Sequence, residues 1–312
     1  MPADIDTLVA RLVERMQPKA KSLIVTIYGD AIAHRGGTAW LGSVIALAAL
    51  VGLNERTVRT SVFRLAQEGW LASQQLGRRS FYRLTEDGRR RIDAVGERLY
   101  GRAPRAWDQG WTVVSIDPSS TDAALREQLR RELSWLGFGA PANGLLLHPA
   151  PDERALRRLL ADVAARGQAL VLRGPALPIV TAEALRTIAR AGWDLQRLAD
   201  EYRGFLDAFR PVWQALRTRP APDERLAFAV RTLLMHGYRR ACLRDPFLPE
   251  ELLPADWPGA AAALLCRNLY RHLQAAAEGH VAGMLETAEG PAPQAHPSYY
   301  LRFGGLEGAP AA

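Results

Sequence analysis

The stretch from residue 54 to residue 91 constrains the fold of this chain more than any other part of the sequence. An apolar segment, Ser43 to Leu50, is followed by a short turn and by an amphipathic segment, residues 55–65, which Asn54 precedes as a helix cap. A basic segment, Ser73 to Leu84, comes next and has the alternation of a hairpin. Two helices joined by a tight turn and followed by a hairpin form a winged helix-turn-helix, a module that binds DNA.

Positive charge is concentrated in the same stretch. The whole chain has 40 Lys and Arg against 33 Asp and Glu, a formal net charge of +7. Residues 54–91 contain nine arginines and four acidic residues, so most of the excess lies there. A concentrated positive field attracts a polyanion and steers its approach. Elsewhere in the chain the many arginines are better explained by the codon usage of a GC-rich genome.

The second predicted helix has two distinct faces. Val58, Val62 and Leu65 fall on one side, with the spacing of residues that pack on a preceding helix. Arginines and threonines fall on the other side, and these side chains can bond guanine edges and contact thymine methyl groups. The residues that we predict to contact DNA, on this helix and on the hairpin, are Asn54, Arg56, Thr57, Arg59, Thr60, Arg64, Arg78 and Arg79.

Two features of this stretch leave alternatives open. Phe63 lies toward the polar side of the helix, which an amphipathic pattern does not explain, and packing under the hairpin is one interpretation. The hairpin tip, Gly77-Arg78-Arg79, is placed for a phosphate or minor-groove contact. A solvated hairpin with two ordinary surface arginines has the same pattern.

The remainder of the chain predicts two further domains, so the expected fold class is α+β multidomain. After a winged-helix domain, residues 1–100, the region 106–217 alternates strand, helix, strand, helix and strand, beginning with Trp111 to Ile116. Such an alternation is typical of a small ferredoxin-like domain. Residues 220–286 predict an all-helical C-terminal domain. Residues 287–312 are rich in Pro, Gly and Ala and predict a disordered tail.

Composition argues against several classes of protein. The two cysteines, Cys242 and Cys266, lack the spacing of metal ligands, which argues against a disulfide scaffold or a zinc site. The acidic residues near the N-terminus argue against a signal peptide. The longest apolar run, Val44 to Leu53, is too short to cross a membrane. We therefore expect a cytoplasmic protein with no membrane partner.

Longer motifs extend over nearly the whole chain, from about Ser22 to Glu286. Those of the N-terminal part are Tyr28-Gly29-Asp30, Trp40-Leu41-Gly42-Ser43, the run from Asn54 to Leu65, Glu68-Gly69-Trp70-Leu71 and Gly77-Arg78-Arg79-Ser80-Phe81-Tyr82. Those of the C-terminal part are His236-Gly237-Tyr238-Arg239-Arg240, Leu243-Arg244-Asp245-Pro246, Leu248-Pro249, Leu252-Leu253-Pro254, Asp256-Trp257 and Leu269-Tyr270. With these motifs the chain resembles the PaaX family, repressors of phenylacetate degradation.

The resemblance implies both a fold and a function. The implied fold is a GntR-like winged helix, a central domain similar to Cas2 and a helical C-terminal domain. The implied function is that of a homodimer that binds double-stranded operator DNA and represses aromatic-acid catabolic genes. The resemblance also implies phenylacetyl-coenzyme A (phenylacetyl-CoA) as the regulatory ligand that relieves DNA binding.

An acyl-CoA effector needs cations for its phosphates and an apolar, aromatic slot for its acyl group. The C-terminal half of the chain offers both kinds of side chain. The candidates are Tyr202, His236, Tyr238, Arg239, Arg240 and Arg244. Aromatic residues at helical spacing are also typical of a helix core, and a different aromatic acyl-CoA has the same chemical requirements.

An enzyme is the alternative to a regulator. Asp117 ends the first strand of the Cas2-like region, where nucleases of that fold hold a metal, but no carboxylate partner is evident. The six histidines are scattered, and none pairs with Ser or Cys in a nucleophile motif. No glycine-rich phosphate loop is present. We expect a non-enzyme without catalytic residues, metal or cofactor, with a metal-dependent nuclease as the alternative.

Overall fold

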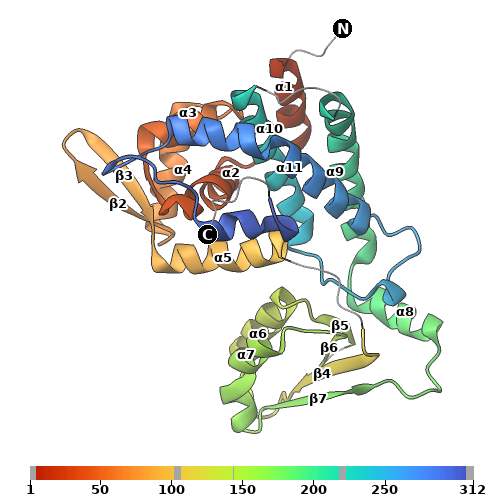
Figure 1. Cartoon of the computed structure of the whole chain (residues 1–312). Helices are drawn as coiled ribbons and strands as arrows, with labels where there is room; N and C mark the ends of the chain where they lie inside the picture. The colour runs from red at the N-terminus through yellow and green to blue at the C-terminus, as the bar shows by residue number, and fades with distance from the viewer. Residues whose placement is uncertain (1–4, 102–106, 143, 218–222, 307–312) are drawn as a thin grey trace. The chain divides into compact units, whose positions relative to one another are not determined.

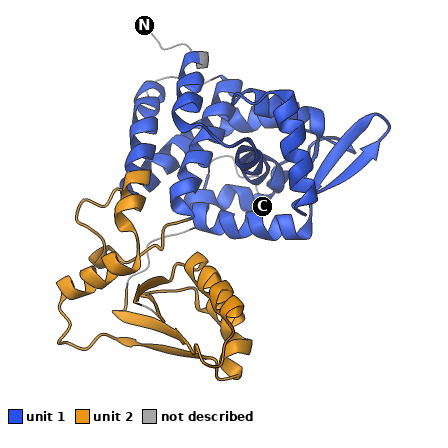
Figure 2. Ribbon diagram, turned by 180° about the vertical axis from the view of Figure 1, so that it is seen from behind, with its two compact units in different colours: residues 1–102, 202–243, 259–312 blue, residues 103–201, 244–258 orange. Residues whose placement is uncertain are grey.

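The computed structural model describes residues 5–101, 107–142, 144–217 and 223–306, which fall into two compact units (Figure 2). The first unit comprises residues 1–102, 202–243 and 259–312, and the second comprises residues 103–201 and 244–258. The predicted C-terminal domain is therefore not a separate unit. Its two long helices belong with the winged module, and the segment between them belongs with the central domain.

The first unit contains the predicted winged helix-turn-helix (Figure 1). Its helices are α1 (Ile5–Met16), α2 (Ala20–Ile27), α3 (Leu41–Ala49), α4 (Glu55–Gln67) and α5 (Glu86–Tyr100). Its strands are β1 (Thr38–Trp40), β2 (Leu71–Leu76) and β3 (Arg79–Leu84), in the antiparallel order β1-β3-β2. Leu23, Ile24 and Ile27 of α2 are completely buried, so tertiary packing makes this β-branched segment helical against its local propensity. The chain continues from α2 into a π-helical turn, Tyr28–Ile32.

The C-terminal helices pack directly on the winged module. The helices α10 (Glu224–Cys242) and α11 (Gly259–Met284) lie against each other, and α10 also contacts α1 and α2. Most residues of α10 are buried, as expected for a helix that is enclosed on nearly all sides. The second half of α9 (Leu195–Leu216) completes this unit.

The second unit has the ferredoxin-like order predicted from the sequence. Its elements are β4 (Gly110–Ile116), α6 (Ala123–Trp135), β5 (Gly139–Ala142), β6 (Leu145–His148), α7 (Glu153–Ala165) and β7 (Ala169–Pro175). The antiparallel sheet has the strand order β5-β6-β4-β7, and α6 and α7 pack on one face through Leu129, Leu133 and Leu156. The sequence prediction missed β5, because it is short and contains Pro141, and it missed α8 (Ala182–Gly192).

The prediction of a disordered tail from residue 287 is wrong for residues 287–306. The strand β8 (Glu286–Thr287) pairs with β9 (Gly290–Pro291), and a 3₁₀ segment follows at Pro297–Gly304. We call residues 285–306 the C-terminal arm. Its Tyr299 is only 1% exposed, so aromatic burial outweighs the Pro- and Gly-rich composition that suggested disorder. Residues 307–312 lie outside the described part of the chain.

A buried ion cluster joins the winged module, the C-terminal helices and the arm. The Arg231 side chain on α10 is completely buried. Its Nε lies 3.0 Å from Oδ2 of Asp30, in the π-helical turn, and its Nη1 lies 2.8 Å from Oε1 of Glu278 on α11. Burial by itself raises the pKa of Glu278, but the Arg231 guanidinium and a hydrogen bond with His34 bring that pKa well below its usual range. Glu278 is therefore ionised.

The arm completes this cluster. Arg302 donates a hydrogen bond of 3.1 Å to Asp30, and the hydroxyls of Tyr100 and Tyr270 donate to the same carboxylate oxygen at 2.8 and 2.9 Å. Tyr299 lies with its ring stacked on His34, at a centroid distance of 4.3 Å. The carboxylate of Asp30 thus holds groups from four parts of the chain.

Replacing Arg231 by methionine tests the structural weight of the cluster. The variant removes one of the cations that face each of the buried carboxylates, so that Asp30 keeps Arg302 and Glu278 keeps Arg35. Removing one partner of a buried pair costs about 3–5 kcal/mol. We expect a loss of this size in urea unfolding at pH 7. Arg267→Met, at an exposed position on α11, should change stability by less than about 0.5 kcal/mol. Equal stability of the two variants would contradict this role for Arg231.

Candidate nucleic-acid interface

The helix α4 is built as the sequence predicted. The side chain of Asn54 accepts a hydrogen bond of 2.9 Å from the backbone N–H of Thr57, which caps the helix. Val58, Val62 and Leu65 are buried, and α4 packs on α2 and α3. The buried side fixes the helix on the module, so the opposite side is turned to solvent.

We call this exposed side, formed by Arg56, Arg59, Thr60 and Arg64, the recognition face. Arg59 is held by Glu55 in an ion pair of 2.7 Å, one helical turn away. Among the described residues, neither Arg56 nor Arg64 takes part in an ion pair. Their guanidinium groups are therefore available to an external acceptor. Thr57 is half-buried and has its backbone N–H in the cap.

Phe63 does not pack under the wing. Its side chain is 57% exposed, whereas the other apolar residues in the middle of α4 are buried. The interpretation of Phe63 as a core residue beneath the hairpin is therefore wrong.

The strands β2 and β3 form the wing, which projects from the helices in Figure 1. Gly77 turns the tip with a φ of 59°, in the left-handed region that favours glycine. Arg78 is exposed and has no ion-pair partner among the described residues. The sequence predicts a DNA contact for Arg79 as well as for Arg78, but in the structure Arg79 already has partners within the protein.

Arg79 is held by the C-terminal arm and by the first strand. Its Nη1 lies 2.6 Å from Oε2 of Glu286, and its guanidinium lies over the ring of Trp40, 4.5 Å from the centroid. The backbone N–H of Glu286 donates to the hydroxyl of Ser43, which fixes the acid beside the wing. Sequence reasoning missed Glu286, because 207 residues separate it from Arg79 and no local pattern reveals the pair.

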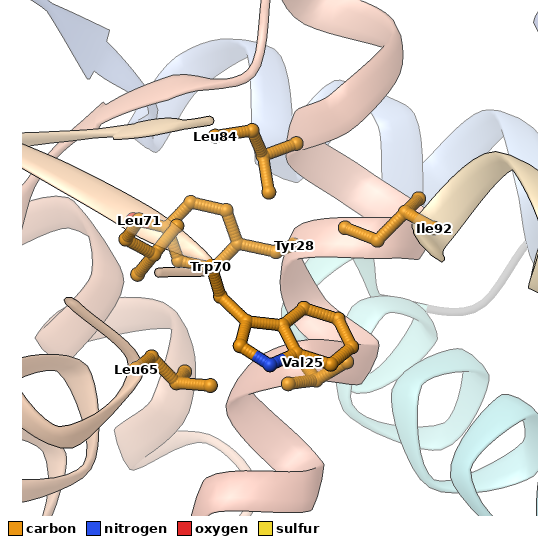
Figure 3. Close-up of a pocket in the computed structure, with 7 residues that line it drawn as sticks. All are labelled: Val25, Tyr28, Leu65, Trp70, Leu71, Leu84 and Ile92. Carbon is orange, nitrogen blue, oxygen red and sulfur yellow. The ribbon is translucent and has the colours of Figure 1, made fainter. Parts of the chain in front are cut away.

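A small cavity lies behind the recognition helix, and its lining side chains are shown in Figure 3. They are Val25, Tyr28, Leu65, Trp70, Leu71, Leu84 and Ile92. The cavity measures about 10 Å³, which is roughly the space of one water molecule. It is therefore a packing feature that connects α2, α4, the wing and α5, and not a site for a ligand the size of an acyl-CoA.

The predicted effector residues divide between the two units. Tyr202 and Tyr238 are buried and lie in an aromatic group with Phe205, whose ring is 5.6 Å from that of Tyr238. These two tyrosines occupy core positions, as the alternative interpretation had it. Arg244 belongs to the second unit, where it is ion-paired with Glu201.

The remaining effector candidates lie on one helix, α10. The imidazole Nδ1 of His236 is 3.2 Å from the hydroxyl of Thr26, and Arg239 donates to the hydroxyl of Ser22 at 3.0 Å. Burial lowers the pKa of His236 to about 4, with smaller contributions from Arg239 and Arg240. Arg240 is exposed. An effector role for these residues stays a prediction.

Asp117 lies in a turn after β4. Hydrogen bonds from Ser120 and Ser119 lower the pKa of its carboxyl to about 2. In the part of the chain that the structure describes, no group of three or more His, Cys, Asp or Glu side chains is arranged to hold a metal ion. Within the same residues, no helix is both long enough and apolar enough to cross a membrane.

Comparison with known proteins decides the family. Residues 19–88 match a family model described as PaaX-like protein, residues 104–184 match the PaaX protein central Cas2-like domain, and residues 193–283 match the PaaX-like protein C-terminal domain. The chain is 36% identical, over 305 residues, to the transcriptional repressor PaaX of Escherichia coli (strain K12). The aligned residues cover 97% of this chain and 95% of that protein. The chain belongs to the PaaX-like family.

The PaaX-like assignment agrees with the fold. The matched regions correspond to the winged module, the ferredoxin-like domain and the C-terminal helices, in that order along the chain.

A solved structure, the uncharacterized protein Rv0674 from Mycobacterium tuberculosis, is 28% identical and covers 75% of this chain and 89% of its own, with a TM-score of 0.49.

The contact between Arg79 and Glu286 predicts that Glu286→Gln binds polyanions more tightly. Arg79 must leave the carboxylate before it can contact a phosphate. Because the pair is half-exposed, we expect a gain of less than about 1 kcal/mol, up to roughly fivefold. The gain is measured on a heparin column, from which Glu286→Gln should elute at a higher salt concentration than the wild type. Glu289→Gln, at an exposed position of the same arm, is the matched control. A Glu286→Gln variant that elutes with or before the wild type would show that the carboxylate does not restrain Arg79.

The buried histidines predict that stability falls as the pH is lowered from 7 to 5. Burial lowers the pKa of both His34 and His236 to about 4, whereas the unfolded chain takes up these protons near pH 6.5. The unfolded state therefore binds more protons below pH 6.5, and the folded state loses stability progressively toward pH 4. His236→Gln should lose less stability than the wild type in thermal unfolding at pH 7 and 5. His296→Gln, at an exposed position, should behave as the wild type. Parallel curves for all three proteins would contradict the assignment.

Proposed function

We propose that this PaaX-like chain is a DNA-binding transcriptional repressor and not an enzyme. The observation that carries the proposal is the recognition face, where Arg56 and Arg64 lie exposed on a capped helix that is followed by a basic wing. The N-terminal residues of a recognition helix reach base edges in the major groove. The 36% identical relative from Escherichia coli is named a transcriptional repressor, which supports the same function.

We further propose that the chain acts as a homodimer on a near-palindromic operator of phenylacetate catabolic genes. Two recognition helices then read two half-sites one helical turn apart or a multiple of it. Phenylacetyl-CoA is the proposed effector, on the strength of the family resemblance. A ligand that binds the DNA-free state more tightly releases the operator, and operator DNA must weaken binding of that ligand by the same factor.

The first experiment is fluorescence anisotropy on the intergenic DNA upstream of the chain's own gene. We expect tight, salt-sensitive binding that phenylacetyl-CoA releases and that free phenylacetate or free coenzyme A does not. Release by another aromatic thioester instead would change the effector and keep the repressor function. Absence of specific binding to such fragments would contradict the repressor proposal.

Arginine variants separate base contacts from phosphate contacts. Arg56→Ala and Arg64→Ala should each weaken specific binding by about 1–3 kcal/mol and relax sequence preference, because a bidentate bond to a guanine edge is lost. Arg78→Ala should weaken all sequences alike and reduce the salt slope by about 1. Anisotropy on specific and unrelated duplexes at several salt concentrations measures both. Unchanged operator affinity in all three variants would exclude this face of the module as the DNA-binding surface.

A further inference from the structure

Phe63 is the one large apolar side chain among the cationic and polar residues on the exposed side of α4. It is 57% exposed, whereas Val58, Val62 and Leu65 of the same helix are at most 2% exposed. Single exposed apolar residues are common on protein surfaces and need no explanation by themselves. The exposure of Phe63 is informative because of its position relative to the recognition face.

Helical geometry places Phe63 in the middle of that face. An α-helix turns by about 100° per residue, so Phe63 points in nearly the same direction as Arg56, two turns earlier. Thr60 lies one turn before it on the same side, and Arg64 and Arg59 flank it. A molecule that contacts Arg56 and Thr60 along this helix therefore also meets the phenyl ring.

We propose that Phe63 is a specificity-determining residue that contacts the C5-methyl group of a thymine in the major groove of the operator. This inference rests on the proposed DNA-binding function. Thymine alone presents an apolar group in that groove, and a phenyl ring can contact a methyl group but cannot bond to the donors and acceptors of the other bases. The flanking arginines hold the DNA and bring the ring to the base edges.

The charge around Phe63 decides between DNA and a second copy of this chain as the occupant. Arg56 and Arg64 lie on the same face without ion-pair partners among the described residues. Two copies meeting through this face would bring like charges together, which is unfavourable. The phosphates of a duplex neutralise the same charges. An apolar contact within a cationic surface therefore fits a nucleic acid better than an identical protein surface.

The test is a cycle in which the protein loses the phenyl ring and the DNA loses its methyl groups. The upstream intergenic fragment is prepared with thymine and again with uracil, which differs only by the C5-methyl group. Wild-type affinity should fall by about fourfold for each methyl group that it contacts, the value of one buried carbon. Phe63→Ala should bind the thymine fragment more weakly and should discriminate less between thymine and uracil. Leu264→Ala, which truncates an exposed apolar residue of α11, should discriminate as the wild type.

The outcomes separate this inference from the proposed function. In one outcome, the wild type binds the fragment and phenylacetyl-CoA releases it, but Phe63→Ala has the same ratio of thymine-fragment to uracil-fragment affinity as the wild type. This outcome overturns the role of Phe63 and leaves the repressor function standing. Failure of the wild type to bind any such fragment overturns both. Thermal unfolding and sedimentation of Phe63→Ala complete the test. A large loss of stability or a changed oligomeric state would show that the ring packs within the protein or against a second copy.

Discussion

The first unit depends on one buried charge, the guanidinium of Arg231. It contacts Asp30 in the π-helical turn after α2 and Glu278 on α11, and the arm adds Arg302 to the same carboxylate of Asp30. Ionised groups out of water are costly unless each finds its partner. The winged module, the C-terminal helices and the arm must therefore assemble together, because none of them satisfies these charges alone. This is the physical reason why three segments that are distant in sequence form a single compact unit.

Three exposed arginines of α4 and the wing tip differ from these buried ones. Inside the unit, Arg231 and Arg302 are enclosed by carboxylates and tyrosine hydroxyls. On α4 and at the wing tip, Arg56, Arg64 and Arg78 are exposed and have no acidic partner among the described residues. Unpaired cations gathered on one surface attract a polyanion. Arg79, the residue after Arg78, is instead paired with Glu286, which offsets its charge. Burial beside acidic groups thus distinguishes Arg231 and Arg302, which hold the unit together, from the exposed arginines of the recognition face.

Local pattern was sufficient to predict the winged helix-turn-helix and the ferredoxin-like alternation. The cap at Asn54, the buried spacing of Val58 and Val62 and the wing strands all depend on neighbours within a few residues. The motif Tyr28-Gly29-Asp30 carries the family resemblance, but the role of its carboxylate is not visible in the sequence, because the partners of Asp30 lie on α5, α10, α11 and the arm. The partner of Arg79 and the order of residues 287–306 were missed for the same reason. Contacts between distant segments have no signature in the local sequence, and Pro- and Gly-rich composition does not distinguish a fixed arm from a free tail.

The arm has a consequence for how the protein can be dissected. The region that matches the family models ends at residue 283, so a fragment designed on that match would stop at the end of α11. Such a fragment would lack Glu286, Tyr299 and Arg302, and with them the contact to the wing and part of the shell around Asp30. The wing and the interior of the unit are thus connected to the same short segment. The winged module therefore depends on contacts from the C-terminal arm, which lies more than 180 residues after the wing in the sequence.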